Sequence, residues 1–421
     1  MKKSTLLATT TLLTGMATVA AAQEAPTSSV VLYGIADVGL NHVTGLKQGT
    51  VTQLASGIME GSRWGLKGNE DLGGGMRTLF TLESRFEIDT GAVSNIPASG
   101  GQVPDRLNTA TLMGLPATAQ PLVSAVAGAL GSRLGVNTAD KNLFDRQAFM
   151  GLVTPVGTIM AGRQYTPGYV VSATFDSMHG ESSLALGQLV SVPASFTIRT
   201  SNALQYAVQA GGLSASLMVA AGEVGGNNSA NRLLGTMATY KGTGFSLGAG
   251  YNTQNNELGE KALTNAILGA SVDIGPGSLS TMYATIKDDH PADLSGVAAL
   301  LVSKGASASS AAAVQNAFIQ AVQQDARLLH IGYRVRSGPH TFTVAYNTVN
   351  DRTANNADRD SYGAAYTYAL SKRTDLNAVL TRFNNSGASQ LAPGGNGFLG
   401  GVTASAGTDS NGLALALRHH F

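Results

Sequence analysis

The chain has 421 residues, a formal net charge of +1, 52 glycines and no cysteine. Only 13% of its residues are charged, about half the usual share for a soluble domain. The lack of cysteine excludes disulfides, thiolate metal sites and a cysteine nucleophile. The balanced charge argues against a nucleic-acid partner, because such proteins carry a basic surface.

Residues 1–22 have the pattern of a secretory signal peptide. Lys2 and Lys3 precede an apolar stretch, which ends at the small residues Ala20-Ala21-Ala22. This order predicts export and cleavage after Ala22. The alternative is an uncleaved anchor helix, which we disfavour because the apolar run is short and contains several threonines. We therefore expect two parts, a signal peptide over 1–22 and one domain over 23–421.

Beyond residue 22, no run of about 18 apolar residues suggests a spanning helix. Instead, large apolar side chains alternate with small or polar ones, as they do in a strand with two different faces. Such a chain enters a membrane only as strands of a closed barrel. The clearest alternating segments are 30–41, 245–252, 329–336, 341–348 and 361–368.

Connections of two lengths separate the alternating segments. Seven are short and rich in glycine, proline or serine: 70–75, 155–157, 211–212, 241–244, 275–277, 337–340 and 371–374. Eight are long and polar: 42–60, 89–143, 164–196, 225–231, 255–261, 288–326, 351–359 and 384–408. Short turns alternating with long loops are typical of an outer-membrane barrel, whereas a soluble β-sandwich gives no reason for this rhythm. The pattern predicts an all-β, antiparallel barrel of about sixteen strands.

Two alanine-rich stretches, 112–135 and 294–326, interrupt the rhythm. The stretch 294–326 is rich in helix formers, which predicts a helix within a long external loop, and 112–135 is similar. A plain loop insertion is the simpler interpretation of both stretches. A role in partner binding or protection is the competing interpretation.

The end of the chain, LALALRHHF (413–421), alternates up to its last residue. Leucines, His419 and Phe421 share one face, and alanines, Arg418 and His420 share the other. A barrel leaves no free strand edge in lipid. We therefore expect this segment to pair with residues 29–41 and close the barrel.

Charged residues in 62–68 and 78–88 lie on the face opposite to the large apolar residues. A charge facing lipid costs about 2–4 kcal/mol near the membrane midplane, so this face is expected to line the lumen. The alternation thus predicts four lumenal residues: Arg63, Lys67, Glu83 and Arg85.

Several long motifs carry a family resemblance. They are SSVVLYGIADVGL (28–40), GSRWGLKGNEDLGGGMRTLFTLES (61–84), LFDRQAFMGL (143–152), GTIMAGRQYTP (157–167), YALSKRTDLNAVLTRFNN (368–385) and the final LRHHF. With them the chain resembles the trimeric general porins of Gram-negative bacteria, in the beta-proteobacterial branch. The resemblance implies a 16-stranded homotrimeric barrel in the outer membrane, with a water-filled pore in each subunit.

The same resemblance implies a constriction. Its third loop folds inward, starting after Tyr165-Thr166-Pro167 and running to about Pro193. Matched motif by motif, the residues that face each other across the pore are Arg63, Arg146, Arg163 and Arg199 on the wall, and Asp176 and Glu181 on the loop. Arg85 stands where the family commonly has a small residue, and the third loop lacks the usual glycine-rich stretch. Pore width and preferred solute therefore stay open.

Arginines facing acidic residues set up a field that favours anions. We expect a passive channel for small hydrophilic solutes and ions, with mild anion preference. The expected partners are outer-membrane lipid, lipopolysaccharide and the assembly machinery, for which the resemblance makes Phe421 the recognition signal. The plainer interpretation is that the arginines only neutralise Glu83, Glu87 or Asp37. The same fold could also serve as a channel specific for small organic anions or, in a different functional class, as the scaffold of an enzyme or adhesin.

Enzyme and cofactor motifs carry little weight in this sequence. The G-x-G-x-x-G match in 394–400 lies in a polar loop without a βαβ context. His419 and His420 are adjacent in a strand and point to opposite faces, so they make a poor metal site. The acidic run 358–360 is better explained as a solvated loop than as a cation site. The sequence predicts no enzyme activity, no cofactor and no metal.

Overall fold

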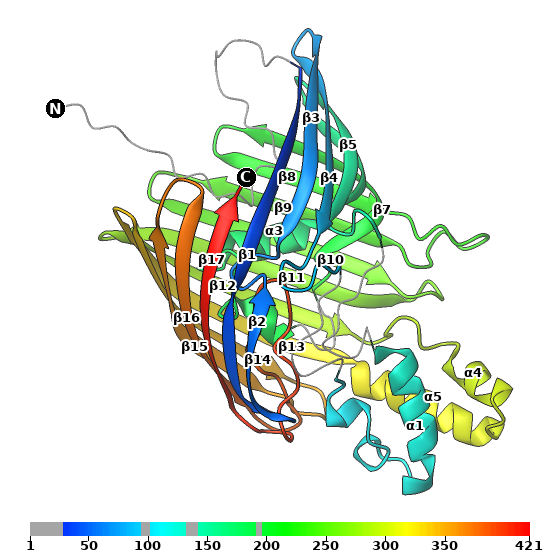
Figure 1. Cartoon of the computed structure of the whole chain (residues 1–421). Helices are drawn as coiled ribbons and strands as arrows, with labels where there is room; N and C mark the ends of the chain where they lie inside the picture. The colour runs from blue at the N-terminus through cyan, green and yellow to red at the C-terminus, as the bar shows by residue number, and fades with distance from the viewer. Residues whose placement is uncertain (1–27, 94–101, 132–141, 191–195) are drawn as a thin grey trace.

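The computed structural model describes residues 28–93, 102–131, 142–190 and 196–421. Its β-segments form a single antiparallel sheet that closes on itself (Figure 1). The segments are β1 (Ser29–Leu46), β2 (Gly49–Ser56), β3 (Arg63–Gly73), β4 (Met76–Arg85), β5 (Gln147–Thr154), β6 (Gly157–Tyr165), β7 (Arg199–Ala210), β8 (Leu213–Ala220), β9 (Leu233–Lys241), β10 (Phe245–Asn255), β11 (Lys261–Ile274), β12 (Gly277–Asp288), β13 (Gln324–Ser337), β14 (His340–Asp351), β15 (Arg359–Ala369), β16 (Thr374–Asn385) and β17 (Ser410–His420).

The barrel has sixteen strand positions, as the sequence predicts, because β2 and β3 share one of them. β3 pairs with the first half of β1, from Ser29 to Ile35, and β2 pairs with the second half, from Val38 to Leu46. Residues 57–62 separate the two segments and turn into the lumen. The second strand is therefore interrupted once, and the interruption brings extra side chains to the pore.

All seven predicted short turns join neighbouring strands at one end of the barrel. The prediction of one long loop was wrong. Residues 42–60 were expected to form a polar loop, but most of them extend β1 and form β2, with a two-residue turn at Lys47 and Gln48. The polar side chains of 42–60 suit strands as well as loops, because one face of each strand is lumenal.

The last strand closes the barrel as the sequence predicts. β17 pairs with β1 from Ile35↔His420 to Val43↔Gly412. Its leucines are 45–51% exposed on the outer face, whereas Ala414 and Ala416 are at most 5% exposed. Phe421 continues the seam, because its backbone N–H and C=O both bond to Gly34.

The third loop folds into the lumen. It holds α3 (Pro167–Phe175) and the 3-10 turn η4 (Leu186–Val190). Thr166 caps α3 by accepting a hydrogen bond from the Tyr169 N–H, and Pro167 takes the first helical position. Phe175 is fully buried against the wall, where a Cβ on Gly248 or Gly269 would overlap its ring. The predicted end of this loop near Pro193 lies outside the described residues.

The two alanine-rich insertions form a helical cap at the end of the barrel where the long loops gather (Figure 1). Their apolar residues, among them Val126, Leu301 and Phe318, share one buried cluster, to which Leu107 from the preceding segment also belongs. The helix predicted in 294–326 is confirmed and is divided into two helices, and a further helix lies in 112–135. The elements of the cap are η1 (Asp105–Leu107), η2 (Thr111–Met113), η3 (Ala117–Ala119), α1 (Gln120–Ala129), α4 (Val297–Ser303) and α5 (Ala308–Val322).

Across the described ranges, no helix has the length and apolar character needed to cross a membrane.

Candidate pore constriction

A cavity of about 270 Å³ lies in the lumen between the third loop and the wall formed around β3 and β7. Its lining combines charged side chains with aromatic and apolar ones, among them Tyr165, Tyr169 and Phe398. Its charged lining residues are Glu60, Arg63, Arg85, Glu87, Arg146, Asp176, Glu181 and Arg199, together with His179. Ions or solutes passing the loop therefore meet charges of both signs at short range.

Three of the lining arginines are bonded to carboxylates. Arg146 donates from Nε to Glu83 at 2.8 Å. Arg85 donates from Nε to Asp145 at 2.6 Å. Arg63 lies 3.4 Å from Glu60, and its Nε donates to the Gly61 carbonyl. These three arginines thus pair with acids, as the plainer interpretation expects. Of the acids it named, Glu83 is among the partners, whereas Asp145 and Glu60 were not predicted.

Arg199 differs from the other three arginines. Its Nη2 donates to the hydroxyl of Tyr165 at 2.8 Å, and its guanidinium carbon lies 4.5 Å from the centroid of the same ring. Arg146 donates to that hydroxyl as well, at 3.2 Å. Within the described residues Arg199 has no carboxylate partner, and its buried Nε has no hydrogen-bond partner.

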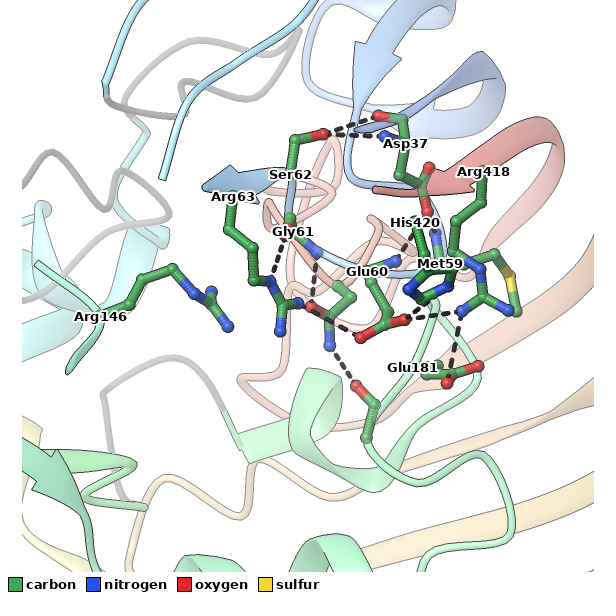
Figure 2. Close-up of polar contacts among 12 residues, drawn as sticks. Asp37, Met59, Glu60, Gly61, Ser62, Arg63, Arg146, Glu181, Arg418 and His420 are labelled. Carbon is green, nitrogen blue, oxygen red and sulfur yellow. Dashed lines mark hydrogen bonds and ion pairs between the residues drawn. The ribbon is translucent and has the colours of Figure 1, made fainter. Parts of the chain in front are cut away.

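Arg418 of β17 connects the wall with the third loop (Figure 2). Its Nη1 lies 2.9 Å from Glu60 and 3.4 Å from Glu181, and its Nη2 lies 3.2 Å from Asp375. The ring of His420 is 3.9 Å from Glu60. One guanidinium therefore holds three carboxylates that come from the 57–62 insertion, the third loop and β16.

The insertion 57–62 is positioned by a carboxylate on β1. Asp37 is fully buried, and its two oxygens accept the backbone N–H groups of Ile58, Met59 and Glu60 at 2.8–3.0 Å (Figure 2). Three amide donors fix the direction of this short segment. As a result, the Glu60 side chain points between Arg63 and Arg418.

The third loop is also bonded to β13 and β14. The Ser177 N–H donates to Nε2 of His330 at 2.9 Å, so this ring nitrogen is the acceptor and Nδ1 carries the proton. Nδ1 then donates to the Asn347 side-chain oxygen at 2.6 Å. Asn347 in turn donates to the Leu184 carbonyl at 2.9 Å. Two fully buried side chains, His330 and Asn347, thus bind the loop at Ser177 and at Leu184.

Burial and nearby charges shift the pKa values of four groups outside the strands: Glu60, Glu87, His179 and Glu181. Burial raises the pKa of Glu87 to about 7. Burial also raises the pKa of Glu181, with Arg418 opposing the shift. For Glu60, burial acts in the same direction, but Arg63 and Arg418 outweigh it and the pKa falls below its usual range. Burial lowers the pKa of His179 to about 4, so this imidazole is neutral at pH 7.

Six of the nine predicted pore residues line the cavity: Arg63, Arg85, Arg146, Asp176, Glu181 and Arg199. Glu83 lies behind them, bonded to Arg146 and to the Tyr33 hydroxyl. Asp176 faces its own loop, because its oxygens accept the N–H groups of Met178 and Leu186.

The structure does not bring the other two predicted residues to the cavity. Lys67 stacks over Tyr33, with Nζ 4.2 Å from the ring centroid. Arg163 pairs with Ala148, and the next residue of β5, Phe149, is buried and points to the opposite face of the strand. The Arg163 side chain donates to the Asp145 carbonyl and the Ser201 hydroxyl. Arg163 therefore lies on the other face of the wall.

Four residues of this site were not predicted as pore residues from the sequence: Glu60, Tyr165, Asp375 and Arg418. Arg418 was placed on the lumenal face by alternation, and the same signal marks it as a pore residue. Glu60 and Asp375 carried no comparable signal, because their roles depend on contacts with Arg418 across more than 40 positions of sequence.

A barrel closed by sixteen antiparallel strands, with a loop folded against charged residues in its lumen, defines a porin. The family model described as Gram-negative porin matches residues 8–388. The chain belongs to this family, and its place is the outer membrane. Family and fold are those of a channel rather than an enzyme.

One curated relative is an outer membrane porin protein of Bordetella pertussis. It is 40% identical over 103 residues, which cover 21% of this chain and 26% of the relative. The chain thus matches about a quarter of the length of that protein.

Two solved structures show how far the fold is shared. The anion-selective porin from Comamonas acidovorans is 23% identical, with a TM-score of 0.65 over 94% of this chain and 100% of that chain. OmpT, an outer membrane protein of Vibrio cholerae, is 13% identical, with a TM-score of 0.57 over 96% of this chain and 100% of that chain.

Proposed function

We propose that the protein forms a water-filled channel for passive diffusion of small hydrophilic solutes and ions, with mild anion preference. The observation that carries this proposal is the cavity between the third loop and the arginine-lined wall. Solutes cross down their gradient, and nothing is converted. The channel's selectivity follows from which of the facing charges are compensated.

The anion preference rests on unequal neutralisation. Counted by formal charge, the four arginines that line the cavity face four acids. Glu87, with a pKa of about 7, is only partly ionised at neutral pH. Asp176 is bonded to loop amides, which spread its charge. Among the described residues, Arg199 has no carboxylate partner, so its positive charge stays uncompensated. A passing anion is therefore favoured over a cation by a modest margin.

The descriptions of two structural relatives support the anion preference and the trimer. The Comamonas protein is described as anion-selective. One structure of the Vibrio protein, 11% identical with a TM-score of 0.55, is described as a trimer form. We extend both properties to this chain, so that the working unit is a homotrimer of barrels, each with its own pore.

The remaining parts of the proposal concern export and assembly. Residues 1–22 serve as a signal peptide that is removed, and residues 23–421 form the barrel domain. The barrel's surroundings are lipid and lipopolysaccharide. The assembly machinery recognises Phe421, a residue that is 44% exposed at the seam.

The test is the zero-current potential of the purified protein in a planar bilayer under a KCl gradient. We expect the sign of an anion-selective channel, and a smaller potential for Arg63→Ala. Arg373→Ala is the matched control, because Arg373 is exposed in the short turn before β16 and outside the cavity. Clear cation selectivity of the wild type, or equal effects of the two substitutions, contradicts the proposal.

A further inference from the structure

We propose that the cavity contains a subsite for small aromatic monocarboxylates, with Arg199 binding the carboxylate and Tyr165 and Tyr169 contacting the ring. This inference rests on the proposed anion-conducting channel and adds a preferred class of solute to it. Three observations carry it, and they concern Arg146 before β5, Tyr165 at the end of β6, Tyr169 in the third loop and Arg199 at the start of β7.

The first observation is an uncompensated charge. Arg63, Arg85 and Arg146 each have a carboxylate within 3.4 Å, whereas Arg199 has only a phenolic oxygen as partner in the part of the chain that the structure describes. Its Nε is buried and unpartnered. Leaving a buried charged donor without a partner is costly, so the site favours an acceptor from solution.

The second observation is convergence. Arg146 and Arg199 donate to the same Tyr165 oxygen, from 3.2 and 2.8 Å. Their guanidinium groups therefore lie next to each other around a neutral atom. Carboxylates accept paired N–H donors from guanidinium groups with good geometry. Because Glu83 already compensates Arg146, one positive charge remains, which suits a monoanion better than a dianion.

The third observation is the aromatic side of the cavity. Tyr165 and Tyr169 stack with ring centroids 5.1 Å apart and planes inclined by 21°. Both rings line the cavity, and Ala173 and Ile198 lie beside them in the lining. A flat apolar ring gains from stacking on such a surface, whereas an acetate methyl group has little area to offer. The charge and the aromatic rings are adjacent because Tyr165 belongs to both.

The experiment compares how three anions reduce the chloride current of the reconstituted full chain. Benzoate, cyclohexanecarboxylate and acetate are titrated at constant ionic strength against wild type, Arg199→Gln and Tyr169→Leu. Arg373→Gln is the matched control for a lost positive charge. Heat-modifiable migration on gels confirms that each variant is folded. The comparison of the three anions on wild type needs no variant.

We expect benzoate to block wild type at a concentration about tenfold below that of acetate, with cyclohexanecarboxylate between them. Arg199→Gln should raise the half-blocking concentration of benzoate about tenfold, since a charge-assisted hydrogen bond contributes roughly that factor. Tyr169→Leu should weaken block by benzoate and leave acetate unchanged.

Three results distinguish a failure of the subsite from a failure of the channel proposal. An anion-selective wild type that responds equally to benzoate and acetate overturns the subsite and leaves the channel proposal intact. A cation-selective wild type overturns the channel proposal itself. Equal benzoate block in Arg199→Gln and wild type also refutes the role of Arg199.

Discussion

Replacing Arg418 by glutamine tests whether one guanidinium sets the charge balance of the constriction and holds the third loop. The substitution leaves Glu60, Glu181 and Asp375 without their shared partner. The Glu60 and Glu181 oxygens lie 2.9 and 3.4 Å from the same Nη1 atom, so they are at most about 6 Å apart. Without Arg418 they repel each other across the gap between wall and loop.

The magnitude follows from Coulomb's law. Two unit charges about 6 Å apart interact by about 0.7 kcal/mol in bulk water and by about 3 kcal/mol at an effective dielectric constant near 20. The same magnitude applies to an anion that passes at a similar distance from Arg418, so such an anion loses attraction of this order in Arg418→Gln. Even the lower value corresponds to about a threefold fall in the chloride-to-potassium permeability ratio. Release of the loop should also increase current noise.

The assay is the zero-current potential together with single-channel noise in planar bilayers. The double variant Glu181→Gln, Arg418→Gln removes one of the repelling acids and should restore part of the selectivity and quieten the channel. Arg373→Gln controls for the loss of a positive charge elsewhere. A permeability ratio and noise level equal to wild type in Arg418→Gln would refute the reasoning.

Three further predictions concern single groups. Because burial raises the pKa of Glu87 to about 7, this acid gains its negative charge as pH rises through 7, so the anion preference of the wild type should fall between about pH 6 and 8. In Glu87→Gln the reversal potential should not change over this interval. If it depends on pH in the variant as it does in wild type, the assignment to Glu87 is wrong. Asn347→Leu removes the bond to the Leu184 carbonyl and should raise current noise, whereas Asn347→Ser, still able to donate, should do so less. Equal noise in the two variants contradicts the idea that this hydrogen bond holds the third loop. Deleting Phe421 should lower insertion into the outer membrane, measured by heat-modifiable protein in membrane fractions, while the inserted fraction conducts normally; undiminished insertion counts against an assembly signal.

Alternation predicts a great deal of this protein because a barrel wall imposes one rule on every strand. It placed Arg63 and Glu83 toward the lumen, and it located the closing pair β1 and β17. The rule loses its force where the register changes. Between Gly162 and Gln164 the pairing with β7 shifts, and the family match for Arg163 did not indicate which side of the wall this residue takes.

The contacts around Glu60 show a second limit of prediction from sequence patterns. The segment 42–60 has polar residues throughout, and nothing local distinguishes a solvated loop from a strand followed by an inward turn. Asp37 decides between them by accepting three amide N–H groups from residues 58–60. Such a contact joins parts of the chain about 20 positions apart, and it has no period that a pattern can reveal.

The helical cap has a consequence for engineering the exterior of this barrel. Its two insertions lie far apart in sequence but share a single apolar cluster, which is separate from the clusters in the lumen. Removing either insertion alone strips the other of its buried partners and exposes residues such as Phe318 and Val126 to water. In grafts or loop-swap chimeras the two segments therefore have to be transferred together, although in the sequence they are separate loops.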